Sequence, residues 1–285
     1  MASFVQDGLR AGEPVLVALT PRHTEWLQEA LGEQSERLEF VDMADVGRNP
    51  AQIIPTMTRF LARSAGRSRP ARGIGEPIWP GRRPEELIES QMHEALLNIA
   101  VDPEIPFWLI CPYDAATLSP TVVEEAHRSH PVITDSTSYQ GSCRYAGRAH
   151  AAAIFSSELA PLRGQPRATV FTAHTADRLF SYLKLKLYVT GLAVNEATTL
   201  ANAIQLLATS SICRGATTGT VSIWNQPEAL ICEVTDDAMV TDVMLGRRAT
   251  LNEEGAGFWH AHDLGDLVQV RSSSTGTKVP IHTWK

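Results

Sequence analysis

Two histidines and an aspartate in the segment GFWHAHDLGD could supply acid/base or metal-binding chemistry. His260 and His262 are one residue apart, and Asp263 follows directly. Imidazole and carboxylate groups exchange protons and bind divalent metals. Both imidazoles would share a face in an extended loop, whereas positions i and i+2 of a helix point about 200° apart. The alternative is one surface and one packed histidine. Cys213 is a candidate nucleophile or a small buried thiol.

A second pair of candidates, Glu76 and His93, lies in the first half of the chain. We expect them to line the carboxyl edge of a parallel sheet, where α/β folds bind ligands. The alternative is a hydrogen-bonded structural histidine. The segment QMHEALLNIA has no second histidine four residues after His93, which excludes a zinc-protease helix.

His127 and His130 form a third pair, which shares one face of a predicted helix. Together with Cys111 and Cys143 they could ligate a metal or a haem. The cysteines of this chain are widely spaced and form no CxxC pair. Free, reduced thiols are therefore the alternative, and they are typical of a cytoplasmic protein.

The elements that must position these residues differ between the two halves. Apolar runs at 14–19, 38–43, 74–79 and 106–114 alternate with helical segments, which predicts a parallel sheet with helices on both faces. After residue 155 come a small, polar stretch, two helical segments and two hairpins that turn at NQPE and SSTG. This pattern predicts an α/β domain over 1–155, a linker over 156–174 and an α+β domain over 175–285.

Composition restricts the class of partner. The chain has 285 residues, of which 44% are hydrophobic and 20% are charged, and its formal net charge is −7. An acidic chain disfavours nucleic acid, because phosphate binding needs a basic face. No window approaches 18 apolar residues and no signal-peptide core is present, so we expect a cytoplasmic protein without a membrane span.

The first half resembles the MEDS sensory domain, found in bacterial regulators. The matching segments are GEPIWPGR (75–82), HEALLN (93–98), CPYD (111–114) and HRSHP (127–131). The resemblance implies a RecA/KaiC-like fold and small-molecule sensing by Glu76, His93, His127 and His130. The segment TPRHTEW after the first strand lacks the GKS or GKT of a P-loop, so we expect no ATP there.

The second half resembles the ATPase domain of histidine kinases, gyrase and anti-sigma-factor kinases, called the Bergerat or GHKL fold. The matching segments are EVTDDAMVTD (233–242), EGAGFW (254–259) and GTKVPIHTW (276–284). The resemblance implies an α+β sandwich that binds ATP or ADP. It also assigns the adenine-binding carboxylate, the glycine-rich lid and a supporting hydroxyl to Asp236, Gly255, Gly257 and Thr277.

Three positions depart from that pattern. The helix AIQLLATSSICRG places Leu206 where the family has its glutamate base and Ser210 where it has its Mg²⁺-binding asparagine. Ala238 stands where the family has a glycine two residues after the adenine-binding aspartate, next to the adenine ring. Leucine accepts neither a proton nor a cation, and loss of an essential base typically removes about 10²–10⁴ of rate. We therefore expect nucleotide binding, if it occurs, without turnover and without Mg²⁺ through the family site.

Three functions remain open. The chain is a regulatory protein that binds a sigma factor or its antagonist, a protein that uses the former ATP pocket for another small molecule or reaction, or an active serine/threonine kinase of the anti-sigma type. The apolar segment DRLFSYLKLKLYVTGLAV also suits a homodimer helix.

Overall fold

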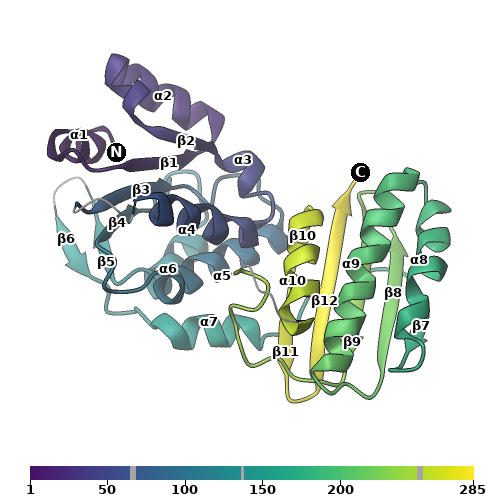
Figure 1. Cartoon of the computed structure of the whole chain (residues 1–285). Coiled ribbons are helices and arrows are strands. Elements are labelled where there is room, and N and C mark those ends of the chain that lie inside the picture. The colour runs from purple at the N-terminus through teal and green to yellow at the C-terminus, as the bar shows by residue number, and fades with distance from the viewer. Residues whose placement is uncertain (65–68, 136–137, 249–252) are drawn as a thin grey trace. The chain divides into compact units, whose positions relative to one another are not determined.

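The computed structural model describes residues 1–64, 69–135, 138–248 and 253–285. The chain divides into two compact units, Met1–His150 and Ala151–Lys285, and the division falls within helix α7 (Gly147–Phe155). Each unit has its own sheet, and the two sheets differ in kind (Figure 1). The protein is therefore mixed α/β, with a four-stranded parallel sheet and a small two-stranded antiparallel sheet in the first unit and a six-stranded antiparallel sheet in the second.

The first unit contains the predicted parallel sheet. Its strands lie in the order β2-β1-β3-β4. Their bounds are β1 Val15–Leu19, β2 Glu39–Asp42, β3 Ala71–Gly75 and β4 Phe107–Ile110. Every residue of β1 is buried, as the continuous apolar run predicted. The chain passes from β1 to β2 on one side and later to β3 on the other, so the carboxyl ends of β1 and β3 flank a topological switch point.

Helices cover both faces of this sheet. Val5 and Leu9 of α1 (Ala2–Ala11) and Leu27 of α2 (Pro21–Leu31) pack with Val15 and Val17 on one face of β1. Residues of three other helices line a small interior space on the opposite face, next to Leu16 and Ala18. These helices are α3 (Met43–Val46), α4 (Ile53–Ser64) and α5 (Pro84–Ala100). The unit also contains α6 (Pro120–Ser129), β5 (Val132–Thr134), β6 (Tyr139–Gly141) and 3-10 turns at Gly32–Arg37 and Pro50–Gln52.

The third strand begins and ends earlier than predicted. The sequence indicated a strand over 74–79, but β3 ends at Gly75. Pro77 has no N–H to donate to a ladder, so a central strand cannot continue through it. The shift places Glu76 directly after the strand, at the carboxyl edge of the sheet.

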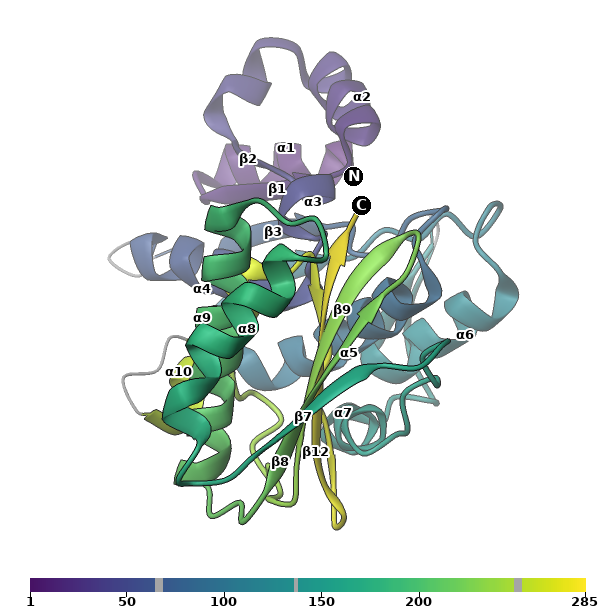
Figure 2. The same cartoon turned by 90° about the vertical axis from the view of Figure 1, so that its right-hand side faces the viewer.

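The second unit contains an antiparallel sheet in the order β10-β12-β9-β8-β7, with β11 paired to β12. Both predicted hairpins are present, β8 with β9 and β11 with β12. The strands are β7 Arg167–Phe171, β8 Gly219–Asn225, β9 Ala229–Asp236, β10 Leu267–Val268, β11 Arg271–Ser273 and β12 Gly276–Trp284. Three helices lie along one face of this sheet (Figure 2). They are α8 (Leu179–Tyr188, after a 3-10 turn at Ala176–Arg178), α9 (Val194–Cys213) and α10 (Glu253–Leu264).

The stretch 156–174 is not simply a linker, because it contributes strand β7 to the edge of this sheet. Phe171 is fully buried, and its ring lies so close to Gly219 that a Cβ on that glycine would come within 2.2 Å of it. The small and polar composition of the stretch concealed the strand, since one edge strand with a single buried aromatic has little apolar periodicity.

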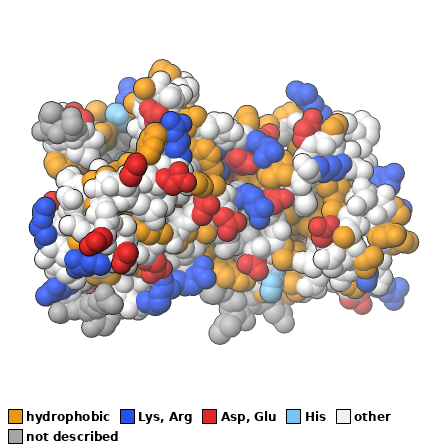
Figure 3. Space-filling view, turned by 90° about the horizontal axis from the view of Figure 1, so that it is seen from above, with side chains coloured by type: hydrophobic (Ala, Val, Ile, Leu, Met, Phe, Trp, Pro, Cys, Tyr) orange, Lys and Arg blue, Asp and Glu red, His pale blue; other side chains and the backbone are white. Residues whose placement is uncertain are grey.

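Charge is spread over the surface. On the face shown in Figure 3, the coloured Lys and Arg side chains are interspersed with Asp, Glu and apolar ones rather than gathered in one basic patch. Within the described residues, no helix has the length and apolarity needed to cross a membrane.

Candidate functional site

Asp236 ends β9 on the side of the sheet that faces the helices, opposite Thr277 on β12. Its Oδ2 accepts hydrogen bonds from the Ser211 hydroxyl at 2.5 Å and from Arg214 Nη2 at 2.8 Å. Its Oδ1 accepts the backbone N–H of Ala238 at 2.9 Å, and Thr277 donates to the Ala238 carbonyl at 2.6 Å. The structure thus brings Asp236 and Thr277 together, but donors from this chain already engage both oxygens of the carboxylate.

Arg214 follows the last residue of α9, and its guanidinium lies between Asp236 and the ring of Phe258, 5.0 Å from the ring centroid. Burial lowers the pKa of Arg214, and the charge of Asp236 opposes that shift. The pair is almost fully buried, with side-chain exposures of 7% for Arg214 and 2% for Asp236. A guanidinium therefore lies where the resemblance places the adenine amino group. The sequence singled out the carboxylate but did not pair Arg214 with it.

The glycines predicted to form a lid lie inside α10. A Cβ on Gly257 would lie 2.5 Å from the carbonyl oxygen of Leu206, so this glycine allows α10 to pack closely on α9. Gly255 is buried in the same helix. The segment that contains the predicted lid is therefore helical and packed on α9, and the assignment of Gly255 and Gly257 to nucleotide binding stays a prediction. Ser210 is completely buried.

The four catalytic candidates do not converge. His260 and Asp263 are exposed on α10, whereas His262 is only 1% exposed. Burial, reinforced by the charge of Arg247, holds the pKa of His262 well below its usual range. Cys213 is exposed at the end of α9. The helical segment separates the two imidazoles, which is the arrangement of one surface and one packed histidine.

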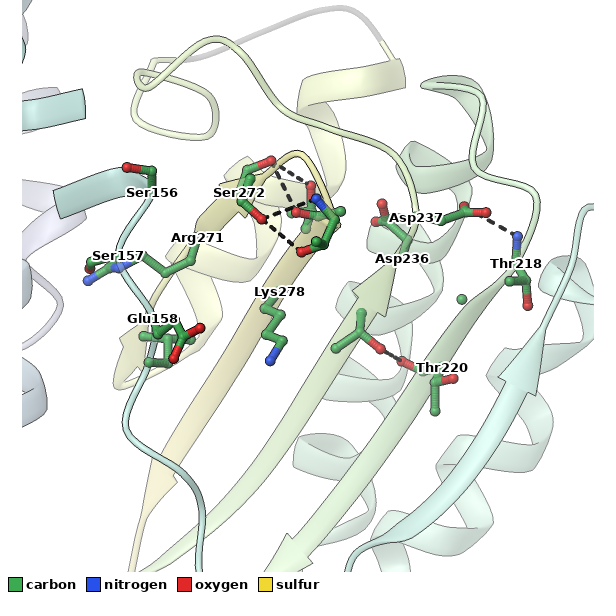
Figure 4. A pocket seen from close by; sticks show the side chains of 17 residues that line it. Ser156, Ser157, Glu158, Thr218, Thr220, Asp236, Asp237, Arg271, Ser272 and Lys278 are labelled. Atoms are coloured by element: carbon green, nitrogen blue, oxygen red, sulfur yellow. Dashed lines mark hydrogen bonds between the residues drawn. The ribbon is translucent and has the colours of Figure 1, made fainter. Parts of the chain in front are cut away.

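A hollow of about 480 Å³ lies on the other face of the antiparallel sheet (Figure 4). Thr220, Thr235 and Lys278 occupy matching positions on neighbouring strands and line its floor, and the segment 156–159 borders it. These residues alternate along their strands with Asp236 and Thr277, so they point away from the helices. The hollow is polar, and Asp236 and Thr277 also belong to its lining, so it adjoins the predicted nucleotide pocket at the ends of β9 and β12.

In the first unit, Glu76 connects two elements across the switch point. Its Oε2 accepts the backbone N–H of Thr20 at 3.0 Å and the Thr20 hydroxyl at 2.9 Å, and its Oε1 lies 2.7 Å from His23 Nδ1. Thr20 occupies the N-cap position of α2, but its hydroxyl contacts this carboxylate rather than its own helix. An internal carboxylate thus occupies the helix N-terminus, a position that favours anions.

A second group of polar side chains meets at the end of β4. Ligand atoms of Glu94 on α5, Cys111 after β4 and His130 after α6 all lie within 4.8 Å of one another. The Tyr113 hydroxyl donates a short hydrogen bond to Glu94 Oε2. Sequence reasoning named Cys111 and His130 but missed Glu94 and Tyr113. The signal that could have found them is that CPYD follows a buried strand and Glu94 adjoins His93.

The other residues proposed with this group lie apart from it. Cys143 is exposed and His127 is half-buried, and neither belongs to the cluster. His93 is buried and, together with Cys111, lines the small interior space beneath the sheet. The structure therefore selects one histidine and one cysteine from the predicted set.

Burial dominates the electrostatics of the cluster. It raises the pKa of Glu94, and this shift is opposed by the charge of His130 and by hydrogen bonds from Tyr113 and Cys111. Burial and the charge of Glu94 together raise the pKa of Cys111 and of Tyr113 well above their usual values. The raised pKa values favour the protonated thiol and phenol, so Glu94 is the one carboxylate that faces the single imidazole in this cluster.

Residues 1–131 match the family model of MEDS, the methanogen/methylotroph, DcmR sensory domain. The matched range contains Glu76 and all four side chains of the cluster. The resemblance stated for the first half of the chain is thereby confirmed. No curated protein matches the chain.

Proposed function

We propose, on the basis of the sensory domain over residues 1–131, that this chain is a cytoplasmic regulatory protein. Its first unit, with a RecA/KaiC-like fold, receives a small-molecule cue. Its second unit is a Bergerat-type sandwich that has lost phosphotransfer and acts by binding a protein partner of the sigma-factor or anti-sigma-antagonist class.

The engagement of Asp236 is the observation that carries this proposal. Adenine can use this carboxylate only if it displaces the Ser211 hydroxyl and the Arg214 guanidinium, which are already within hydrogen-bond distance. Leu206 at the position of the base offers no group that could activate a hydroxyl. Both features disfavour the kinase reaction.

Helix α8 supports a binding role. Tyr182, Leu185, Tyr188 and Val189 are exposed on and just after this helix, and Leu185 is 64% exposed. Apolar side chains gathered on one helix of a soluble protein often mark an interaction surface. A partner protein or a second copy of this chain would bury them.

Incubation with labelled ATP and a panel of sigma factors and antagonists tests the proposal. We expect no label on any serine. We also expect the chain to bind one partner of the panel, with an affinity that Leu185→Glu lowers at least about tenfold. Ile88→Glu is the matched control, because Ile88 is also an exposed aliphatic residue on a helix but lies in the first unit. Transfer of label to a serine of any partner would refute the proposal.

A small-molecule ligand in the second unit is the second candidate, and the hollow beside Lys278 is the observation that favours it. A polar or anionic ligand would suit Lys278 and the threonines on the floor. Thermal-shift screening with Lys278→Ala as the control tests this candidate. Stabilisation that Lys278→Ala leaves unchanged would argue against it.

A further inference from the structure

Glu94, Cys111 and His130 bring a carboxylate, a thiol and an imidazole together from three separate elements, with their ligand atoms within 4.8 Å of one another. We infer that this cluster is a binding site for a divalent transition-metal ion of the zinc class. The inference goes beyond the proposed function, because it assigns a metal to the first unit whatever the second unit does.

The state of the Glu94 carboxylate is the first argument. The residue is 2% exposed, and among the described residues its Oε1 receives no N–H or O–H hydrogen bond, so the Cys111 thiol is the remaining donor to this carboxylate. By contrast, both oxygens of Glu76 and both oxygens of Asp236 are engaged. A thiol is a weak donor, so this buried oxygen is poorly satisfied, and a cation would be a stronger partner for it.

The orientation of His130 is the second argument. Its Nδ1 lies 2.8 Å from the carbonyl oxygen of Ala126, which assigns the ring proton to Nδ1 in the neutral imidazole. Its Nε2 then directs a lone pair toward Glu94 Oε1, 3.7 Å away. Two electron-rich atoms that face each other at this distance can share a metal ion. A metal-binding histidine usually donates its other ring N–H to a carboxylate or a backbone carbonyl, which fixes the tautomer and the orientation of the ring.

Tyr113 orients the carboxylate in the same way as Ala126 orients the imidazole. Its hydroxyl donates to Glu94 Oε2, which leaves Oε1 as the oxygen that faces the imidazole. The two ligating groups are thus held in place by partners that are not themselves ligands.

The mixed ligand set determines the kind of metal. Thiolate, imidazole and carboxylate together suit zinc and its neighbours, whereas magnesium and calcium prefer oxygen ligands alone. Three protein ligands leave one tetrahedral position for water or an incoming small molecule. Cys111 and His130 are only partly buried, so solvent reaches the site.

Metal titration of the full chain, reduced and stripped by a chelator, tests the inference. We expect Zn²⁺ to bind one to one in calorimetry and Co²⁺ to give tetrahedral visible bands with a thiolate-to-metal charge-transfer band. Cys111→Ser should abolish the charge-transfer band and lower the affinity for Zn²⁺ by at least about 100-fold. Tyr113→Phe should lower the affinity for Zn²⁺ about tenfold and retain the band.

Cys143→Ser and His127→Gln are matched controls, because they remove the same side-chain types outside the cluster. Both should leave the band and the affinity unchanged. Absence of one-to-one binding in the wild-type chain would overturn the inference and leave an imidazolium–carboxylate pair only. A charge-transfer band that survives Cys111→Ser would also overturn it. The wild-type cobalt spectrum requires no variant to fold, and neither readout depends on phosphotransfer or partner capture.

Discussion

Glu94 in the first unit and Asp236 in the second are both buried carboxylates near the end of a strand in their own sheet, yet they are in opposite states. Asp236 accepts hydrogen bonds from Ser211, Arg214 and the backbone of Ala238. Glu94 accepts hydrogen bonds from the Tyr113 hydroxyl and the weakly donating Cys111 thiol, and among the described residues its Oε1 receives none from an N–H or O–H group. The difference shows that a carboxylate recognised from a motif can be fully engaged by donors of its own chain, while a carboxylate that no motif marks can be left with few donors.

The largest effect should come from removal of the partner of Asp236. Arg214→Met would leave a buried carboxylate without its counter-charge, and loss of one partner of a buried pair costs about 3–5 kcal/mol of unfolding free energy. Urea denaturation measures it. A loss below 1 kcal/mol, on the order of a surface pair, would mean that the pocket is open to water and that the contrast with Glu94 is unfounded.

Glu76→Gln should cause the next largest loss of unfolding free energy, because it weakens the hydrogen bonds that Thr20 and His23 make with this carboxylate at the N-terminus of α2. Hydrogen bonds to a charged group contribute about 1.5–3 kcal/mol. Thr20→Val is the control, since it removes only the hydroxyl donor and should cost about 1 kcal/mol. Equal losses for both variants would show that the carboxylate charge is irrelevant.

Gly257→Ala tests whether that glycine serves helix packing rather than phosphate binding. The added methyl would meet the backbone of Leu206, so α10 must shift from α9, and overpacking of this kind costs about 1–3 kcal/mol. Gly141→Ala, which meets no atom within 4 Å, should change stability by less than about 0.5 kcal/mol. Thermal unfolding of both variants gives the answer, and an unaffected Gly257→Ala would restore the lid interpretation.

The smallest effect concerns pH. His262 has a pKa well below its usual range because it is buried and faces Arg247. In the unfolded chain this histidine binds a proton below about pH 6.5, whereas in the folded chain it stays neutral to a lower pH. The stability contributed by this residue is therefore present above that pH and is lost as the pH falls. The loss reaches at most about 1.4 kcal/mol per pH unit. Denaturation between pH 7 and pH 5 should show a shallower decline in His262→Gln, and parallel curves would refute the assignment.

Much of the fold follows from local pattern. The apolar run of β1, the alternation of strands and helices and the turns at NQPE and SSTG predicted the sheets of both units. Strand β7 escaped detection, because its main apolar anchor, Phe171, pairs with a glycine far along the chain. The end of β3 was misplaced because apolar residues continue past Gly75, although Pro77 cannot extend the ladder.

By itself, the sequence determined which residue types are available: a leucine in place of a base, a cysteine and a histidine in reach of a metal, an aspartate at a strand end. Only the tertiary structure decided how these groups are partnered. Arg214 forms an ion pair with Asp236. Helix α10 exposes His260 and buries His262, and α5 places Glu94 beside Cys111 and His130. The physical reason is that hydrogen bonding and desolvation depend on side chains brought together from distant positions, which spacing along one chain does not encode.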